Sequence, residues 1–453
     1  MAKFNREKAL RKIEFKRKWR NYSRYVYIAV PCVLCCLLCL YFAYSKFFVS
    51  EEQAVIRTTV GDFIYGDIVI SAYIDGEYSN TIPGKDDGYI VEKVSCDNDA
   101  IGKWNSDDWG IMVTDLSKRT KCNVYFKKKP DSKVPEIIAQ LDTSGKCPLM
   151  NDDGSVNVTG VEATNGYLCK AKDAYGDSYY YRGNVTNNYV KFADKYWRIV
   201  RINGDGTVRV IYDGTSAHAN GEASADRQIG TSAFNSSYND NAYVGYMYGK
   251  TGASTYADAH ANTNNSTIKT YIDDWYKTNI VGTTNEQYLA DNIFCNDRSM
   301  AGNNSGTGAG TSVTYYRWYN GPWESENYSK YNKKMMLTCS QKNDAFTVSD
   351  TTNGNGALTY PVGLLSTDEI ALAGGWNAAN SGYYLYSGQV WWASSPSRFN
   401  GGSAFVRYVD SNGNANRSYY VYDGNGVRPV FNLKAEVLLQ GSGTASDPYR
   451  ISS

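Results

Sequence analysis

The stretch that decides the fold runs from Val390 to Leu433 and reads VWWASSPSRFNGGSAFVRYVDSNGNANRSYYVYDGNGVRPVFNL. It starts with the aromatic pair Trp391-Trp392 and ends with Val427–Leu433, and most residues between these ends are Ser, Asn, Gly, Asp, Tyr and Arg. Binding surfaces favour these residues, because Tyr offers a large contact area with few rotors and Arg donates several hydrogen bonds. The stretch carries no set of residues typical of catalysis. It therefore predicts a rigid scaffold with a recognition surface.

Local patterns predict how this surface is built. A hairpin is expected from Ala404–Val409 to Ser418–Tyr422, with its turn at Asp410–Gly413. Successive strand residues face opposite ways, so one residue of the Trp391-Trp392 pair is expected in the core and one at the surface. Arg428 is expected to anchor the last strand. The residues predicted on or near the ligand-binding surface are Trp392, Ser397, Arg398, Asn400, Arg407, Tyr408, Asp410, Asn412, Asn414, Asn416, Arg417, Tyr419, Tyr420, Tyr422 and Asp423.

With 453 residues the chain is too long for one ordinary domain. Residues 51–129 alternate around an Asp75-Gly76 turn and predict a small, immunoglobulin-like β-sandwich that serves as a stalk. After a proline-bearing linker, residues 136–453 form a second domain. Helices are expected at Ser266–Ile280 and after the capping-box pattern Ser366-x-x-Glu369, among short strands and long loops. The predicted fold class is α+β.

The N-terminal segment suggests a membrane protein. Residues 1–24 are rich in Lys and Arg, and the run from Tyr25 to Tyr44 holds no charge. About 20 such residues can cross a bilayer as a helix. The expectation is a transmembrane helix at 25–48 in a single-pass plasma-membrane protein with a cytoplasmic N-terminus and extracellular domains. A cleaved signal peptide is the alternative, because Ala43-Tyr44-Ser45 is a small-x-small triplet.

The distribution of charge and the number of cysteines indicate which ligands and which disulfides to expect. The formal net charge is +1, but the first 24 residues hold a cluster of basic side chains, so the remainder is mildly acidic. Nucleic acid is therefore not expected as a ligand. Six cysteines lie after the apolar run, and an even number in an exported region predicts disulfides. Among 15 possible pairings, the simplest joins sequence neighbours. These pairs are Cys96–Cys122, Cys147–Cys169 and Cys295–Cys339.

Several segments of the second domain resemble the C-type-lectin-like fold in its formylglycine-generating-enzyme branch, which includes retroelement-variable proteins and exported proteins of gut Firmicutes. The segments that carry the resemblance are Tyr179–Val185, Tyr196–Asp205, Asn239–Gly249, Phe294–Ser299, Thr359–Glu369, Trp391–Pro396, Gly426–Leu433 and Gly441–Ile451. The resemblance implies a scaffold that displays a ligand-facing surface on its final strands and loops. The true enzymes of that branch use a cysteine pair, whereas Cys295 and Cys339 sit in no matching motif.

Other catalytic and metal-binding patterns are weak. His218 and His260 are the only histidines, and both are expected at the surface. No HExxH motif is present, and no metal site is predicted. Calcium stays open as a cofactor, because Asn151–Gly154 and Asp410-x-Asn412-x-Asn414 offer oxygen ligands, but both are also typical turn sequences. No other cofactor is expected.

The leading hypothesis is a membrane-anchored extracellular protein that recognises a protein or glycan through its aromatic and polar C-terminal surface. The first alternative is a structural spacer of the cell envelope without a specific ligand. The second is a divergent enzyme, for which a free Cys295 or Cys339 would be the sign.

Overall fold

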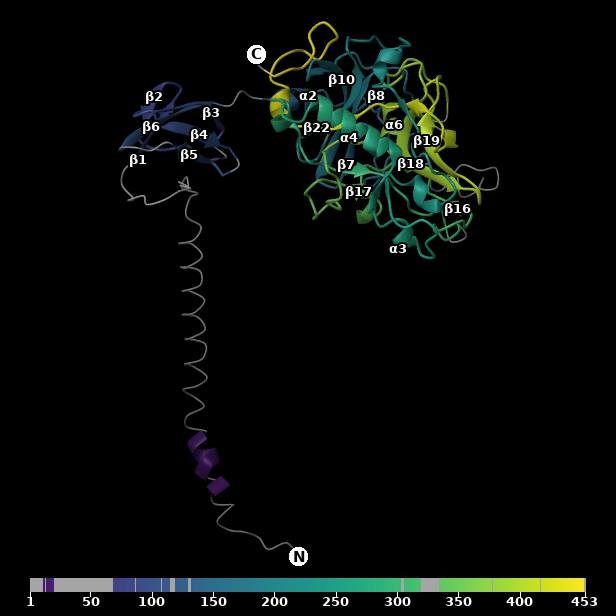
Figure 1. The fold of residues 1–453 in the computed structure, drawn as a ribbon, viewed down its shortest axis with the longest axis horizontal. Coiled ribbons are helices and arrows are strands. Elements are labelled where there is room, and N and C mark those ends of the chain that lie inside the picture. The colour runs from purple at the N-terminus through teal and green to yellow at the C-terminus, as the bar shows by residue number, and fades with distance from the viewer. Residues whose placement is uncertain are drawn as a thin grey trace, which may run out of the picture. The chain divides into compact units, whose positions relative to one another are not determined.

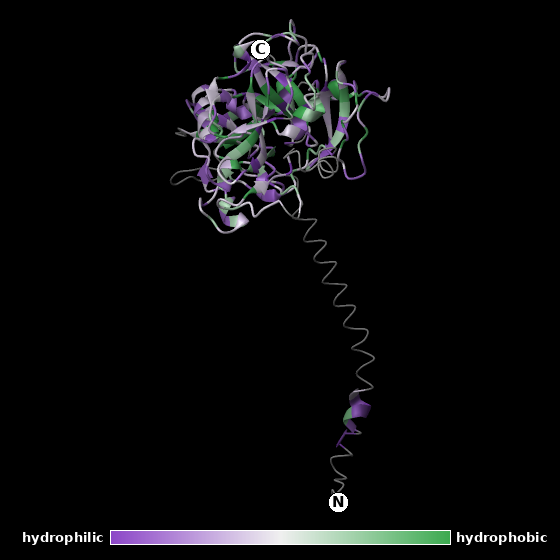
Figure 2. Ribbon diagram, turned by 90° about the vertical axis from the view of Figure 1, so that its right-hand side faces the viewer, coloured by the Kyte–Doolittle hydropathy of each residue, from purple (hydrophilic) through white to green (hydrophobic). Residues whose placement is uncertain are grey.

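The computed structural model describes residues 11–12, 14–19, 68–85, 87–106, 108–114, 119–128, 132–302, 305–318, 334–376, 378–415 and 417–451. The chain divides into two compact units, Met1–Lys129 and Pro130–Ser453 (Figure 1). Figure 2 shows hydrophobic colour on several strands and hydrophilic colour on many of the surrounding loops.

The first unit is a small sheet covered by a hairpin. Its strands are β1 (Ile68–Ile74), β2 (Glu77–Ser79), β3 (Tyr89–Cys96), β4 (Ile101–Asn105), β5 (Gly110–Thr114) and β6 (Thr120–Lys128). The sheet has the order β2-β1-β6-β3, with β1 parallel to β6, and β4 and β5 pair separately. The β1–β2 turn uses Asp75 and Gly76 at positive φ, as an Asp-Gly hairpin turn requires. Trp104 of the hairpin packs edge-on against Phe126 of the sheet, with ring centroids 5.5 Å apart.

The second unit contains two six-stranded sheets and several two-stranded ones. The first large sheet has the order β22-β11-β10-β8-β7, with β9 paired to β10; the second has the order β12-β21-β18-β19-β20, with β16 paired to β18. The strands of the first are β7 (Tyr167–Asp173), β8 (Gly176–Arg182), β9 (Tyr189–Phe192), β10 (Lys195–Ile202), β11 (Val208–Gly214) and β22 (Val430–Leu433). Those of the second are β12 (Thr231–Ser232), β16 (Thr314–Tyr315), β18 (Trp391–Phe399), β19 (Ala404–Val409), β20 (Arg417–Tyr420) and β21 (Asn425–Gly426). The small sheets hold β13 (Met247–Tyr248), β14 (Asn264–Asn265), β15 (Phe294–Cys295) and β17 (Ala345–Phe346).

The helices that the structure describes in the second unit are short, except for one of 13 residues. The α-helices are α2 (Val134–Ile138), α3 (Tyr256–Ala259), α4 (Thr267–Asn279) and α6 (Thr367–Ala373), and the 3₁₀ turns are η1 (Ala225–Arg227), η2 (Asn241–Val244), η3 (Glu286–Tyr288), η4 (Lys342–Asp344) and η5 (Ala435–Val437). Ser266 caps α4, and Ser366 and Glu369 form the capping box of α6, so both predicted helices are confirmed. The core of the unit is aromatic: Trp197 of β10 stacks on Phe431 of β22 at 4.7 Å.

The structure corrects the predicted fold class. The protein is mostly β, with 32% strand and 15% helix, rather than an α+β, C-type-lectin-like domain behind a membrane helix. The two helical patterns in the sequence are real, but short strands in several small sheets dominate the chain. Within its described residues, no helix combines the length and apolar character that a membrane span needs. The transmembrane helix expected at 25–48 lies outside the described residues, so the single-pass plasma-membrane assignment has no structural support.

Buried carboxylates tie distant segments of the second unit together. Asp213, at the end of β11, accepts hydrogen bonds of 2.8 Å from Arg227 and Arg428, and Arg198 lies 3.9 Å away. All four side chains are fully buried. Burial lowers the pKa of Arg428 to about 10, although the Asp213 carboxylate opposes that shift. One anion thus compensates three desolvated cations.

A second carboxylate, Glu369 of α6, repeats this arrangement. It contacts Arg209 at 2.6 Å and Arg201 at 3.2 Å, and both arginines are buried. Burial alone would raise the pKa of Glu369, but the two guanidiniums outweigh it and hold the pKa below its ordinary value. Glu369 therefore stays charged and links α6 to β10 and β11.

Both histidines are buried, which corrects the expectation that they lie at the surface. His218 lies between two carboxylates, with its Nδ1 2.7 Å from Glu222 and its Nε2 3.0 Å from Asp226. His260 is fully buried, and its Nδ1 lies 3.3 Å from the Arg298 guanidinium. Burial, followed by the Arg298 charge, lowers the pKa of His260 well below 6.5. His260 is thus neutral in the folded protein.

Removing the Asp213 carboxylate is expected to destabilise the second unit strongly. An Asp213→Asn variant leaves three buried guanidiniums without an anion, and breaking a buried ion pair typically costs about 3–5 kcal/mol. Asp447→Asn is the matched control, because it breaks the exposed contact of 2.7 Å to Arg450, and exposed pairs contribute about 0–1 kcal/mol. Urea unfolding measures both. Equal free energies of unfolding for the two variants would contradict the role given to Asp213.

Acid is expected to destabilise the protein through His260. Because the folded pKa lies below the unfolded value of 6.5, the unfolded chain binds a proton that the folded chain does not, and stability falls as the pH drops below that value. The loss attributable to this group reaches about 1.4 kcal/mol near pH 5.5. His260→Gln should flatten the pH dependence between about pH 7.5 and 5.5 relative to wild type. Denaturant unfolding at several pH values checks this, and an unchanged slope would refute it.

Candidate functional site

The predicted recognition surface lies on three neighbouring strands of the second large sheet. β18 pairs with β19, and β19 pairs with β20 in an antiparallel register that sets Phe405 opposite Tyr420. The described residues of β18 and β19 are nearly all buried, whereas β20 lies at the edge of the sheet and is mostly exposed. The display of side chains to solvent is therefore concentrated on β20 and the turns beside it.

Three tyrosines form a row on this edge, called here the tyrosine row: Tyr238, Tyr422 and Tyr420. Their exposed fractions are 44%, 42% and 39%. The Tyr238 and Tyr422 ring centroids are 4.8 Å apart, and those of Tyr422 and Tyr420 are 5.1 Å apart with nearly parallel planes. Each ring is thus held by a neighbouring ring and still keeps solvent-accessible area.

The row is anchored to the scaffold beneath it. Tyr420 packs on Phe405 of β19 at 4.4 Å, and the Arg398 guanidinium lies 4.3 Å from the Phe405 ring. On the other face of β20, Tyr419 contacts Tyr408 edge-on at 5.2 Å. The exposed rings of Tyr420 and Tyr419 thus rest on the buried Phe405 and the half-buried Tyr408.

Tyr238 belongs to the row but was absent from the predicted surface. Its backbone carbonyl accepts a hydrogen bond of 2.8 Å from the Ala404 amide at the start of β19, which draws a loop more than 160 residues upstream to this edge. The only sequence signal is one aromatic residue in the polar run Asn235–Asn241.

The predicted surface residues divide into four groups. Those exposed are Asn400, Asn412, Arg417, Tyr419, Tyr420 and Tyr422. Those half-buried are Arg398, Tyr408, Asp410, Asn414 and Asp423. Those buried are Trp392, Ser397 and Arg407. Asn416 lies outside the described residues.

The three buried residues do not lie on the surface as predicted. Trp392 donates its indole N–H to the Ser232 carbonyl at 2.8 Å, and the guanidinium of Arg407 donates to the Trp318 carbonyl. Trp391 is also buried, so the pair is not divided between core and surface. β18 has neighbouring strands on both sides, and other parts of the domain cover both of its faces. The alternation of side chains between two faces therefore does not separate core residues from surface residues. Arg428 does anchor the last strand, as predicted, through Asp213 and the Leu385 carbonyl.

The segments considered for calcium form hydrogen-bonded turns. Asp410 accepts backbone hydrogen bonds from Asn412 at 2.9 Å and Asn414 at 3.0 Å, and Asp153 accepts from the Ser155 amide at 3.0 Å. Asp153 also contacts Lys334 at 2.8 Å. Among the residues that the structure describes, no three His, Cys, Asp or Glu side chains are grouped to hold a metal ion. The turn interpretation accounts for these side chains, and calcium binding stays untested.

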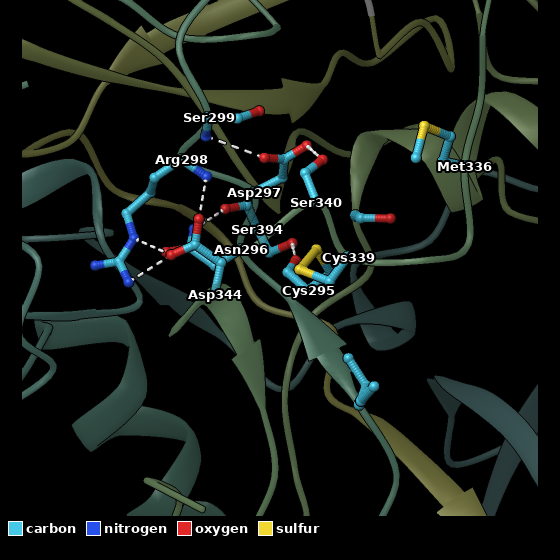
Figure 3. The surroundings of a disulfide bond; sticks show 12 residues. Cys295, Asn296, Asp297, Arg298, Ser299, Met336, Cys339, Ser340, Asp344 and Ser394 are labelled. Atoms are coloured by element: carbon cyan, nitrogen blue, oxygen red, sulfur yellow. Dashed lines mark hydrogen bonds and ion pairs between the residues drawn. A yellow bond between two sulfur atoms is a disulfide. The ribbon is translucent and has the colours of Figure 1, made fainter. Parts of the chain in front are cut away.

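The three predicted disulfides are confirmed: Cys96–Cys122, Cys147–Cys169 and Cys295–Cys339. Figure 3 shows the last of them, with Cys295 at the end of β15 beside the loop that carries Cys339. The Ser394 hydroxyl donates to the Cys295 carbonyl at 2.7 Å, and Asp297 accepts from Ser340 at 2.9 Å nearby. Both thiols that an enzyme of the resembled branch would need are joined to each other here.

A family model described as a domain of unknown function (DUF6273) matches residues 265–435. The matched segment begins at the N-terminus of α4 and extends past β22, so it includes β18, β19 and β20 and covers less than half of the chain. No curated protein and no solved structure matches the chain. The resemblance to the formylglycine-generating-enzyme branch therefore stays a prediction, and the matched segment contains Tyr420 and Tyr422 of the tyrosine row but not Tyr238.

Proposed function

We propose that the protein recognises a macromolecular ligand, a protein or a glycan, through the tyrosine row and the polar side chains beside it. The observation that carries the proposal is that three exposed tyrosines lie in a continuous row: Tyr420 on the edge strand β20, Tyr422 just after it, and Tyr238 from an upstream loop in contact with Tyr422. Exposed large apolar side chains that are scattered singly need no explanation, but contiguous ones mark interaction sites.

The row is suited to binding because it is held in place before a ligand arrives. Tyrosine immobilises few rotors on binding, and ring contacts to Tyr422 and Phe405 already restrict Tyr420. Arg417 is exposed and extends from the same strand, 3.8 Å from Asp410, and it offers a forked donor at the rim. The entropic cost of ordering this surface is thus partly met on folding.

The disulfides support a role outside the reducing cytosol, because such bonds persist in oxidising compartments. They also support a binding role over catalysis, since the Cys295 and Cys339 thiols are not free. The spacer alternative explains a polar, soluble surface, but it gives no reason for an aromatic row. Comparison of related sequences separates these two: variability confined to exposed positions of 397–423 favours recognition, and uniform drift favours a spacer.

Truncating the row is expected to weaken binding more than tenfold. The full chain is screened against glycan and surface-protein panels, and a bound ligand is then titrated with the triple variant Tyr238→Ala, Tyr420→Ala, Tyr422→Ala. Interface tyrosines that act as hot spots contribute at least about 2 kcal/mol each, so affinity should fall more than tenfold. Tyr78→Ala is the matched control, because Tyr78 is 61% exposed in the first unit.

An unchanged affinity in the triple variant would place the binding site elsewhere. If the full chain binds no glycan and no protein of the two panels, the spacer role is favoured. Loss of binding in the Tyr78→Ala control would show a general effect of exposed aromatic area rather than recognition by the row.

A further inference from the structure

A polar groove lies in the second unit, on the side of β7 and β8 rather than β20. Its volume is about 590 Å³, within the range of about 300–1,000 Å³ typical of small-ligand sites. Three segments form its walls, residues 140–144, 166–168 and 184–187, and Tyr181 of β8 also lines it. None of these residues belongs to the tyrosine row.

Two of the walls are joined covalently. The loop that contains residues 140–144 ends at Cys147, which is bonded to Cys169, next to Leu168 of the second wall. The Asp142 amide also donates to the Leu168 carbonyl at 2.9 Å. This part of the groove is therefore formed in the folded chain, without need of a ligand to assemble it.

The third wall is fixed by amide contacts and by the buried arginine network. Asn187 donates to the Gln140 side chain at 2.7 Å, and Asn220 donates to the Asn184 side chain at 2.7 Å. Arg198, one of the arginines around Asp213, donates to the Val185 carbonyl at 2.7 Å. The groove thus has three restrained walls.

The lining is polar but almost uncharged. Among the described residues that line the groove, Asp142 alone is charged, and its carboxylate is occupied by Ser144 and the amides of Lys146 and Cys147. The Asn184 Nδ2 and the Thr186 Oγ1 have no hydrogen-bond partner within the described chain. Amide and hydroxyl groups that are free to donate and accept suit a ligand rich in hydroxyls.

Two tyrosines, Tyr167 and Tyr181, also belong to the lining of the groove. Tyr167 is half-buried in the lining, where its ring offers an apolar surface. Tyr181 is 2% exposed, and its hydroxyl has no partner among the described residues. An unpaired buried hydroxyl is unfavourable, because it loses its bonds to water without replacement. Because that hydroxyl is itself buried, the groups that the groove offers to an occupant are those of Tyr167, Asn184 and Thr186.

We propose that this groove is a second binding site, for a neutral oligosaccharide. A sugar presents hydroxyls that match the amides and an apolar ring face that matches Tyr167. An anionic ligand would find no lining cation, and a lipid or an apolar peptide would leave the Asn184 amide and the Thr186 hydroxyl unpaired. Neutral sugar chemistry is thus the class that satisfies the lining.

The test uses the full chain and isothermal titration with cellotetraose, chitotetraose and maltotetraose as neutral probes and a tetragalacturonate as the charged probe. At least one neutral probe should bind saturably at millimolar concentration, and the charged probe should not. Thr186→Trp places a bulky ring at an exposed position of the wall and should reduce affinity at least tenfold. Tyr167→Ala should have a similar effect through loss of the ring face.

Tyr422→Ala serves as the control, since it alters the tyrosine row and should leave saccharide affinity unchanged. Thermal melting confirms that each variant is folded. Absence of binding by all three neutral probes would overturn the proposal, as would tighter binding of the charged probe or full affinity in the folded Thr186→Trp variant. Loss of saccharide affinity in the Tyr422→Ala control would assign the sugar to the tyrosine row instead.

Discussion

The second unit depends on the contacts of a single buried carboxylate, that of Asp213, with guanidiniums from three separate segments. Arg198 comes from β10, Arg227 from η1 and Arg428 from the approach to β22. A lone buried cation is far too costly, so these segments are stable in the interior only when they meet at Asp213. The carboxylate therefore selects one arrangement of β10, η1 and β22 and disfavours others of similar apolar burial.

The same principle recurs at Glu369, which links α6 to β10 and β11, and at Asp344, whose carboxylate contacts Arg298 at 2.6 Å. Buried ion pairs of this kind contribute less to stability than well-packed apolar groups, but they penalise wrong packing heavily. In a unit with short strands and long loops, that penalty favours one arrangement of the segments over the others. Arg428, one of the three guanidiniums at Asp213, also lies 5.1 Å from the ring of Trp391 on β18, which connects this network to the sheet that contains β20.

Local chemistry made much of this structure predictable. The Asp75-Gly76 turn, the caps at Ser266 and Ser366, the hairpin from β19 to β20 and the three cysteine pairs all follow from short-range patterns. The burial of Trp392, Ser397 and Arg407 does not, because β18 is covered on both faces and its pairing with β19 shifts register near Pro396. Tyr238 was missed because its place beside Tyr422 is created by a long-range backbone contact. Helices leave clear signals in a sequence, such as capping residues and apolar periodicity. The signals of α4 and α6 therefore led to an α+β prediction for a chain that is mostly β.

In and beside the turn that joins β19 to β20, some positions are strongly constrained by packing and others are exposed. Gly413 has φ +83°, and a Cβ there would lie 2.5 Å from the Asn380 carbonyl oxygen, while Ala415 and Val421 are fully buried. Asn412, Arg417 and Tyr419, in between and beside them, face solvent. Mutational drift can therefore exchange the outward residues freely while selection on folding preserves the inward ones. Under the proposed recognition role, such a segment can acquire new specificities over evolutionary time while the rest of the domain keeps its fold.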